Sequence, residues 1–218
     1  MRAAPHTLSV FDDELEQLRA LVCEMGGRVE AAVGEAVGAL VALDEARALA
    51  VIAGDARIDS LAARIELEAV QLIALRAPLA DDLREVLAAF KIAGLIARMG
   101  DCAKNIAHRA ALAGDCRAAA PLKSLVNMKD AALAMLKGAL DAFTARDPAA
   151  AARIAAMDDG VDRFHVCISA ALIEMMAEDP RHIAVATQLL FVSQKLERVG
   201  DHAVGVAEMV RFAAGTEG

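Results

Sequence analysis

Apolar residues recur every three or four positions near the start of this 218-residue chain, and this spacing predicts one long α-helix. At 1.5 Å per residue, a run of roughly 30 residues makes a helix about 45 Å long. A helix of that length with one apolar stripe packs against partners of similar length, so the sequence predicts a helical bundle. The stripe consists of Phe11, Leu15, Leu18, Val22, Met25, Val29, Val33, Val37 and Leu40.

Capping residues and prolines divide the rest of the chain into further helices. Asp44 is a good N-cap for a second helix that extends to about Leu75. Pro78 is expected in the first turn of a third helix, which continues to about Leu112 and is stopped by Gly114. No alternating β-type run competes with this pattern. The sequence therefore predicts an all-α protein of six long helices, with later helix starts near Pro121, Pro148 and Pro180.

The chain also contains an internal repeat. Residues 114–121 are the expected linker, and they divide the six helices three and three. Asp55 and Asp59 match Asp158 and Asp162 at an offset of 103 residues. Residues 96–101 match residues 196–201 at an offset of 100. We therefore expect two tandem, pseudo-symmetric three-helix bundles, formed by residues 8–114 and 120–213.

Carboxylates occupy matched positions in the two halves. Each half has two aspartates four residues apart on its second helix, and the third helix of the second half repeats this spacing. Residues four apart share a helix face, and antiparallel neighbouring helices can bring two such pairs together. Oxygen ligands suit a hard or borderline cation such as Mg, Mn or iron. The predicted metal ligands are Asp55, Asp59, Asp101, Asn105, Asp158, Asp162, Glu197 and Asp201.

A different interpretation of the acidic pairs needs no cation. Acidic pairs are common on exposed helix faces, where ion pairs with nearby arginines contribute little to stability. His165 follows Asp162 by three residues and is either a nitrogen ligand or a partly buried polar group. The recurrence of the pairs at matched positions strengthens the case for a cation site, and both interpretations stay open. The arginines available for ion pairs are Arg57, Arg98, Arg163 and Arg198.

Composition excludes several classes of function. The formal net charge is −8 and no basic cluster is present, which argues against nucleic-acid binding. Although mean hydropathy is +0.42, the longest stretch without a charge, residues 183–194, has 12 residues, and a membrane span needs about 20. Four widely spaced cysteines and the lack of an apolar targeting segment favour a cytoplasmic protein with reduced thiols. No nucleophile or phosphate-loop motif is present in the sequence, so no catalytic residue is expected.

Several of these segments resemble the PhoU family, the accessory proteins of phosphate transport. The family shows two tandem three-helix bundles, each with an acidic pair on its second and third helices. The resemblance covers about residues 8–213 and implies the fold predicted above. It is carried by residues 25–30, 55–59, 76–84 and 98–107, and most specifically by Leu196-Glu197-Arg198-Val199-Gly200-Asp201-His202-Ala203.

The resemblance implies a regulator. Family members act as negative regulators of the phosphate-starvation response in the cytoplasm, often as dimers, and connect the ATPase subunit of the phosphate ABC transporter to a sensor histidine kinase. Some bind iron or other metals through the acidic pairs, so iron, Mg, Mn or Zn is the expected cofactor and a homodimer the expected assembly. Ala97 and Gly205 each remove an oxygen donor that the family pattern supplies, and we expect the second half to hold the stronger site. The alternative function is a carboxylate-cluster metal-dependent enzyme or a metal-storage protein.

Overall fold

The computed structural model describes residues 5–112, 116 and 121–216, and all regular elements in this part of the chain are helical. This confirms the prediction of an all-α fold with six long helices. A single 3₁₀ turn, η1 (Pro180–His182), precedes the last helix. The helices are α1 (Pro5–Ala42), α2 (Glu45–Arg76), α3 (Asp81–Leu112), α4 (Leu122–Ala145), α5 (Pro148–Glu178) and α6 (Ile183–Ala213).

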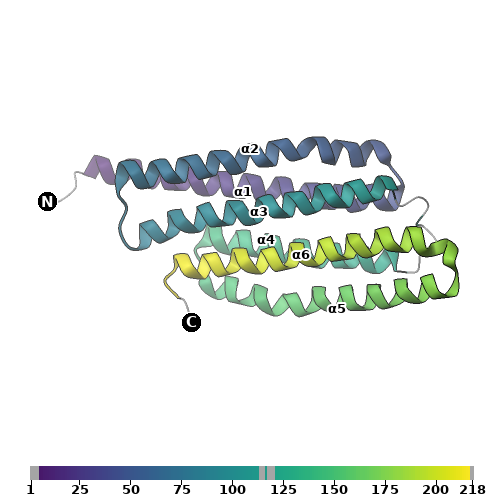
Figure 1. The fold of residues 1–218 in the computed structure, drawn as a ribbon. Helices are drawn as coiled ribbons and strands as arrows, with labels where there is room; N and C mark the ends of the chain where they lie inside the picture. The colour runs from purple at the N-terminus through teal and green to yellow at the C-terminus, as the bar shows by residue number, and fades with distance from the viewer. Residues whose placement is uncertain (1–4, 113–115, 117–120, 217–218) are drawn as a thin grey trace.

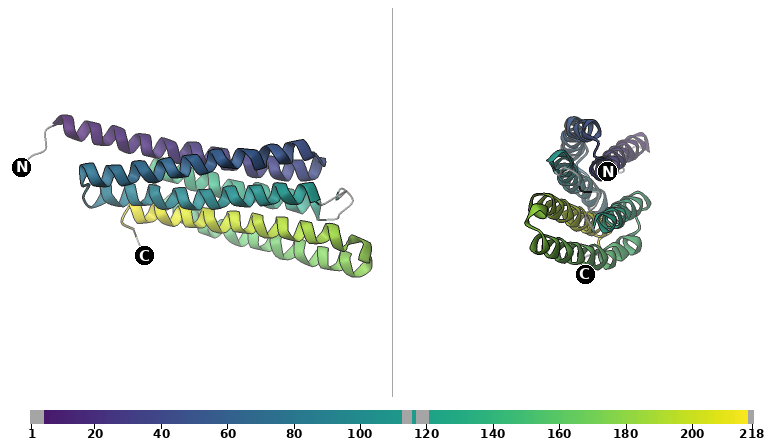
Figure 2. Two further views of the ribbon diagram at one scale, coloured as in Figure 1. Left: turned by 45° about the horizontal axis from the view of Figure 1, so that its top comes forward. Right: turned by 90° about the vertical axis from the view of Figure 1, so that its right-hand side faces the viewer.

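The helices form two three-helix bundles that lie side by side (Figure 1). The end-on view in Figure 2 shows one bundle above the other. Helix α3 packs against α6 and α1 packs against α4, whereas among the described helices α2 and α5 contact only members of their own bundle. The order of neighbouring helices across the molecule is therefore α2, α3, α6 and α5. Helices α1 and α4 contact each other, and they pack against α3 and α6 respectively.

Most of the predicted helix boundaries agree with the structure. The Asp44 carboxylate accepts a hydrogen bond from the Arg47 backbone nitrogen at 3.0 Å and caps α2, as expected. Asp147 caps α5 in the same way, and Pro148 is the first residue of that helix. The predicted stop at Gly114 and most of the predicted linker lie outside the described residues.

The predicted place of Pro78 within the third helix is wrong. Pro78 lies in the turn before α3, which begins three residues later at Asp81. Ala77 ends α2 in a left-handed conformation with φ 45°, and Ala80 has φ 48°, so the chain needs extra residues to reverse its direction. Asp81 and Asp82 then place negative charge in the first turn of α3, where the helix dipole favours it.

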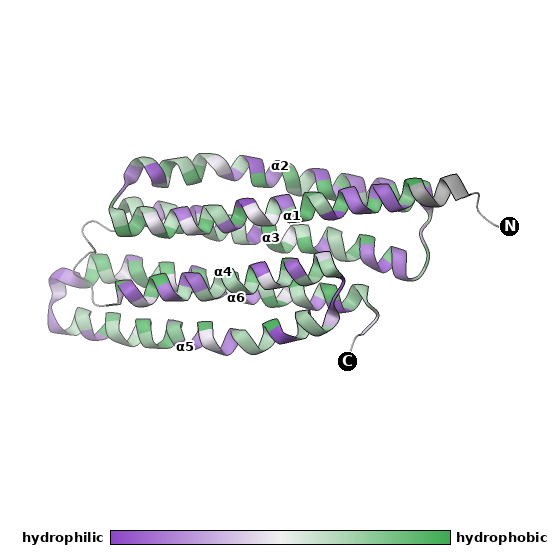
Figure 3. Cartoon of the chain, turned by 180° about the vertical axis from the view of Figure 1, so that it is seen from behind, coloured by the Kyte–Doolittle hydropathy of each residue, from purple (hydrophilic) through white to green (hydrophobic). Residues whose placement is uncertain are grey.

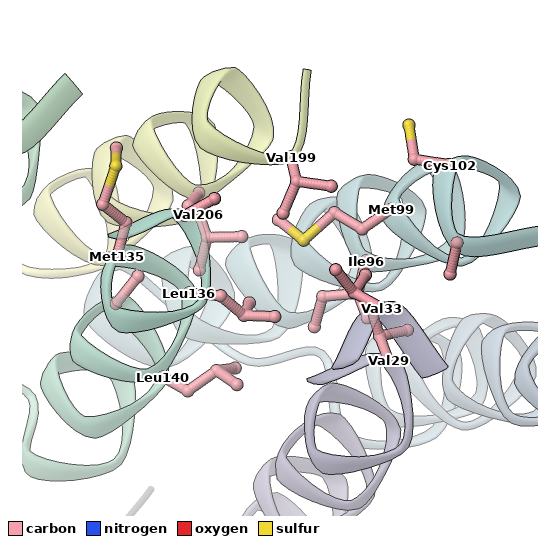
Figure 4. Close-up of a cluster of buried hydrophobic side chains, with 14 of the residues drawn as sticks. Val29, Val33, Ile96, Met99, Cys102, Met135, Leu136, Leu140, Val199 and Val206 are labelled. Carbon is pink, nitrogen blue, oxygen red and sulfur yellow. The ribbon is translucent and has the colours of Figure 1, made fainter. Parts of the chain in front are cut away.

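One continuous apolar core extends through both bundles. Val29 and Val33 of α1, Ile96 and Met99 of α3, and Val199 of α6 are fully buried and lie close together (Figure 4). Many other core positions are alanines, which allow helix backbones to approach closely. Figure 3 shows hydrophilic and hydrophobic residues mixed along the helices, and no described helix combines the length and hydrophobicity needed to cross a membrane.

Gly26 and Gly27 offer a matched test of the contact between α1 and α4. A Cβ atom at Gly26 would lie 2.3 Å from Leu140 Cδ1 in the buried interface, whereas one at Gly27 would meet nothing within 4 Å. We expect Gly27→Ala to raise the free energy of unfolding by about 0.5–1 kcal/mol through helix propensity. Gly26→Ala is expected to lower it by about 1 kcal/mol, because Leu140 must move within a packed core. Urea denaturation measures both, and equal stabilisation would contradict the close contact.

Candidate functional site

In each half, an aspartate of the second helix lies opposite a glycine of the third helix. A Cβ atom at Gly200 of α6 would lie 3.2 Å from Asp158 Oδ1 on α5. A Cβ atom at Gly100 of α3 would lie 3.1 Å from Ile58 Cγ2 and 3.8 Å from Asp55 Oδ1 on α2. Both glycines are buried. The two halves therefore build the same local arrangement, in which a glycine on the third helix faces an aspartate on the second.

The N-terminal carboxylate set consists of Asp55, Asp59 and Asp101. Asp55 is buried, with 5% of its surface exposed, whereas Asp59 and Asp101 are exposed. The Lys104 ammonium donates a hydrogen bond to Asp55 Oδ2, and the Nζ–Oδ2 distance is 2.6 Å. This hydrogen bond and the Asp55 charge raise the pKa of Lys104, and the charges of Asp101 and Asp59 raise it further. The Lys104 ammonium therefore pairs with Asp55, and the charges of Asp59 and Asp101 also favour its protonated form.

The other two positions of this half add little to a cation site. Asn105 is exposed, and its Nδ2 atom donates to the Asp101 carbonyl oxygen in the same helix at 2.7 Å. Ala97 is half-buried and has no donor atom. The predicted ligand Asn105 is thus hydrogen-bonded within its own helix, while Asp55 is paired with the Lys104 ammonium group.

The C-terminal carboxylate set consists of Asp158, Asp162, Glu197 and Asp201. Asp158 is half-buried, and its Oδ1 atom is buried without a hydrogen-bond partner. Burial raises the pKa of Asp158, and the negative charges of Asp162, Asp201, Asp159 and Glu197 raise it further. The other three predicted ligands of this half therefore all act on Asp158. No ion pair to Asp158, Asp162 or Asp201 occurs within the described residues.

His165 belongs to the rim of this second set. Its Nδ1 atom lies 2.6 Å from the Ser193 hydroxyl, and its Nε2 atom lies 3.8 Å from Glu197 Oε2. Ser193 is fully buried on α6. The hydrogen bond to Ser193 fixes the orientation of the imidazole ring, which keeps its second nitrogen near Glu197. His165 is therefore a partly buried polar group, as one of the two interpretations expects, and its second nitrogen lies near a carboxylate.

The sequence pattern does not single out Lys104 or Ser193. A comparison of the two repeats could have found Lys104, since the uncharged Val204 occupies the equivalent position of the second half at the offset of 100 residues. Ser193 has no sequence signal, because its contact with His165 depends on the packing register of α5 and α6. The arginine interpretation is not supported: no ion pair joins Arg57, Arg98, Arg163 or Arg198 to the two carboxylate sets within residues 5–112, 116 and 121–216.

The two sets differ in how well they suit a cation. Among the described residues, no group of three or more His, Cys, Asp or Glu side chains is already gathered to hold a metal ion. The C-terminal set nevertheless has the donor chemistry of a hard cation site and a buried oxygen without a partner. The N-terminal set does not fit, because an ammonium group already neutralises its one buried carboxylate.

Asp158→Asn is expected to stabilise the protein at neutral pH by about 1 kcal/mol, since it removes the charge of a partly buried carboxylate without a partner. The raised pKa of Asp158 means that the folded state holds this proton more tightly than the unfolded state. Stability is therefore lost as pH rises from the usual Asp pKa through the raised value. The variant should lose this acid-side slope, which thermal unfolding between about pH 3 and 7 measures. An unchanged slope would contradict the assignment.

Comparison with known proteins gives a consistent result over nearly the whole chain. The PhoU domain model matches residues 22–110 and again 125–210. A "Phosphate-specific transport system accessory protein PhoU homolog" from Zymomonas mobilis is 42% identical over 96% of this chain and 88% of its own length. A protein of the same description from Caulobacter vibrioides is 41% identical over 95% of this chain and 90% of its own.

Solved structures agree with these sequence matches. The crystal structure of PhoU from Pseudomonas aeruginosa superimposes with a TM-score of 0.90 at 33% identity, covering 95% of this chain and all of the other. The phosphate transport system regulatory protein PhoU from Streptococcus pneumoniae gives 0.89 at 28% identity, covering 95% and 98%. Because the family domain matches twice, the sequence similarity spans nearly the whole chain and the fold is shared, the chain belongs to the PhoU family of phosphate-specific transport system accessory proteins.

Proposed function

We propose that this chain is a cytoplasmic negative regulator of phosphate uptake and of the phosphate-starvation response. In this proposal it is a homodimeric, metal-binding adaptor between the ATPase subunit of a phosphate ABC transporter and a sensor histidine kinase. The observation that carries the proposal is its near full-length similarity to phosphate-specific transport accessory proteins. The family is one of accessory and regulatory proteins, so the enzyme alternative is not retained.

The outer helices support the adaptor part of the proposal. On α2, Leu67 and Val70 are 58% and 55% exposed, and on α5, Val166 and Ile173 are 65% and 60% exposed. Residues three and seven apart share a helix face, so each outer helix presents an apolar strip on its own side of the molecule. Two such strips on different bundles suit an adaptor that contacts two proteins, or one partner and a second copy of itself.

The C-terminal carboxylate set supports the metal-binding part. Its four carboxylates repel one another, and no lysine or arginine within the described residues neutralises Asp158. A divalent or trivalent cation, which could be iron, Mg, Mn or Zn, would relieve this repulsion and supply a partner for the buried Asp158 oxygen. Binding to the folded chain would then stabilise it in proportion to the logarithm of metal concentration.

The regulatory proposal is tested by deleting the gene and measuring alkaline phosphatase activity in phosphate-rich medium. We expect the deletion strain to express the enzyme constitutively and the wild-type gene to restore repression. Continued repression in the deletion strain would overturn the negative-regulator proposal. Pull-down of the transporter ATPase and of the histidine kinase, with Leu67→Glu and Val166→Glu variants, identifies the strip that each partner contacts. Sedimentation of the purified chain tests the dimer.

A further inference from the structure

Residues 97–105 of α3 and the matched residues 197–205 of α6 differ in formal charge at two positions. The first half has Ala97 and Lys104 on α3 where the second half has Glu197 and Val204 on α6. Each difference makes the first half less negative, one by removing a carboxylate and the other by adding an ammonium group. The remaining aspartates, Asp55, Asp59 and Asp101, are matched in full by the second half.

The position of Lys104 makes its charge more than a surface feature. Its Nζ atom lies 2.6 Å from Asp55 Oδ2, although the two residues are 49 positions apart and belong to different helices. The Asp55 side chain is 7% exposed, and that of Lys104 is 38% exposed. The lysine stem therefore extends from the solvent side and places the ammonium group on the one buried carboxylate of the set. A metal ion bound through Asp55 Oδ2 would have to displace this ammonium group.

We infer that Lys104 serves as the built-in cation of the N-terminal carboxylate set, which closes this half to metal ions and confines metal binding to the C-terminal set. This inference rests on the metal-binding part of the proposed function. Lys104 and Ala97 are then specificity-determining residues. The ammonium group neutralises Asp55 without a cofactor. The second half has Val204 at the matched position, so its carboxylates are left for a cation to neutralise.

The test is to give the first half the residues of the second. Purified wild-type chain, Lys104→Val, Ala97→Glu and the double variant Ala97→Glu/Lys104→Val are titrated with Mn²⁺, and bound ions are counted by equilibrium dialysis and by electron paramagnetic resonance. We expect about one ion per chain for the wild type and for Ala97→Glu, and about two for the double variant. Lys104→Arg is the matched control, since it keeps the positive charge and should leave the count unchanged.

The outcomes separate this inference from the proposed function. Two ions in the wild type would overturn the role of Lys104 while metal binding stands. No ion in the wild type but one in the double variant would support Lys104 as the closing group and overturn binding at the C-terminal set. No ion in either protein would overturn both. A count of one in the wild type and one in a folded double variant would also overturn the role of Lys104.

Thermal unfolding provides a second readout that does not depend on counting ions. Without metal, Lys104→Val is expected to lower Tm, because Asp55 loses its counter-charge, whereas Lys104→Arg should lower it less. Mn²⁺ should then raise the Tm of the double variant by more than it raises that of the wild type, since two sites are filled in place of one. An equal Mn²⁺-induced rise in the two proteins would overturn the inference.

Discussion

Arg19→Met is expected to lower the free energy of unfolding by about 3 kcal/mol at neutral pH, which is the cost of leaving a largely buried carboxylate without its main partner. Arg19 Nε on α1 donates to Glu85 Oε1 on α3, and the two side chains are only 11% and 12% exposed. The remaining partner of Glu85 is Arg146, whose Nη2 atom lies 3.0 Å from Oε2 but whose side chain is 59% exposed.

The cost of Arg19→Met should shrink in acid. Burial raises the pKa of Glu85, and the hydrogen bond and charge of Arg19 hold it lower than burial alone would. Removing Arg19 raises this pKa further, so Glu85 takes up a proton more readily in the folded variant. A raised carboxyl pKa means that stability is lost as pH rises through it. The difference between variant and wild type should therefore be smaller near pH 4 than near pH 7.

A matched control separates this effect from ordinary surface ion pairs. Arg28 and Glu24 form an exposed pair on α1 at 2.8 Å, with side chains 42% and 48% exposed. Arg28→Met should cost about 0.3–0.5 kcal/mol. Urea denaturation of Arg19→Met, Glu85→Gln and the double variant gives the coupling energy between Arg19 and Glu85. A coupling energy no larger than the cost of Arg28→Met would contradict the buried ion pair.

Ile96→Ala is expected to cost about 3 kcal/mol, the usual range for removing a large side chain from a packed core. Ile96 is fully buried on α3, and Figure 4 shows it beside Met99 of the same helix and Val29 and Val33 of α1. The cavity would lie between α3 and α1, two long helices that cannot collapse into it without disturbing contacts along their whole length.

The control for Ile96→Ala is the same change at an exposed position. Ile173 on α5 is 60% exposed, and Ile173→Ala should change the free energy of unfolding by less than about 0.5 kcal/mol. Denaturant midpoints of the two variants decide between a tightly and a loosely packed core between α1 and α3. A cost below about 1 kcal/mol for Ile96→Ala would show that the core between α1 and α3 is not close-packed.

Helical periodicity accounts for most of what the sequence reveals about the fold. Apolar stripes that repeat every three or four residues persist for whole helices, and Asp44 and Asp147 are caps that act locally, so both signals predict the elements well. Pro78 misled because a proline fits both the first turn of a helix and the turn before it. The left-handed backbone of Ala77 and Ala80 places Pro78 in the turn. Alanine rarely adopts this conformation, so the sequence does not reveal it.

The candidate site was only partly predictable for a related reason. Spacing within one helix places Asp158 and Asp162 on one face, and the repeat gives Glu197 and Asp201 as their partners. The identity of the residue that faces Asp55 depends on the register of α3 against α2, which composition and spacing do not determine. Lys104 therefore reads as an ordinary surface lysine until the two helices are placed together.

Metal binding by the purified chain tests the central claim, that the carboxylates of α5 and α6 form a cation site. Wild-type protein and Glu197→Ala, prepared without chelators, are titrated with Mn²⁺ while bound metal is measured. We expect about one ion per wild-type chain and at least about 10- to 100-fold weaker binding in the variant. A loss of that size is usual when a residue that only hydrogen-bonds to a metal ligand is removed, and Glu197 is itself a proposed ligand. Equal binding by the two proteins, or no binding by the wild type, would contradict the claim.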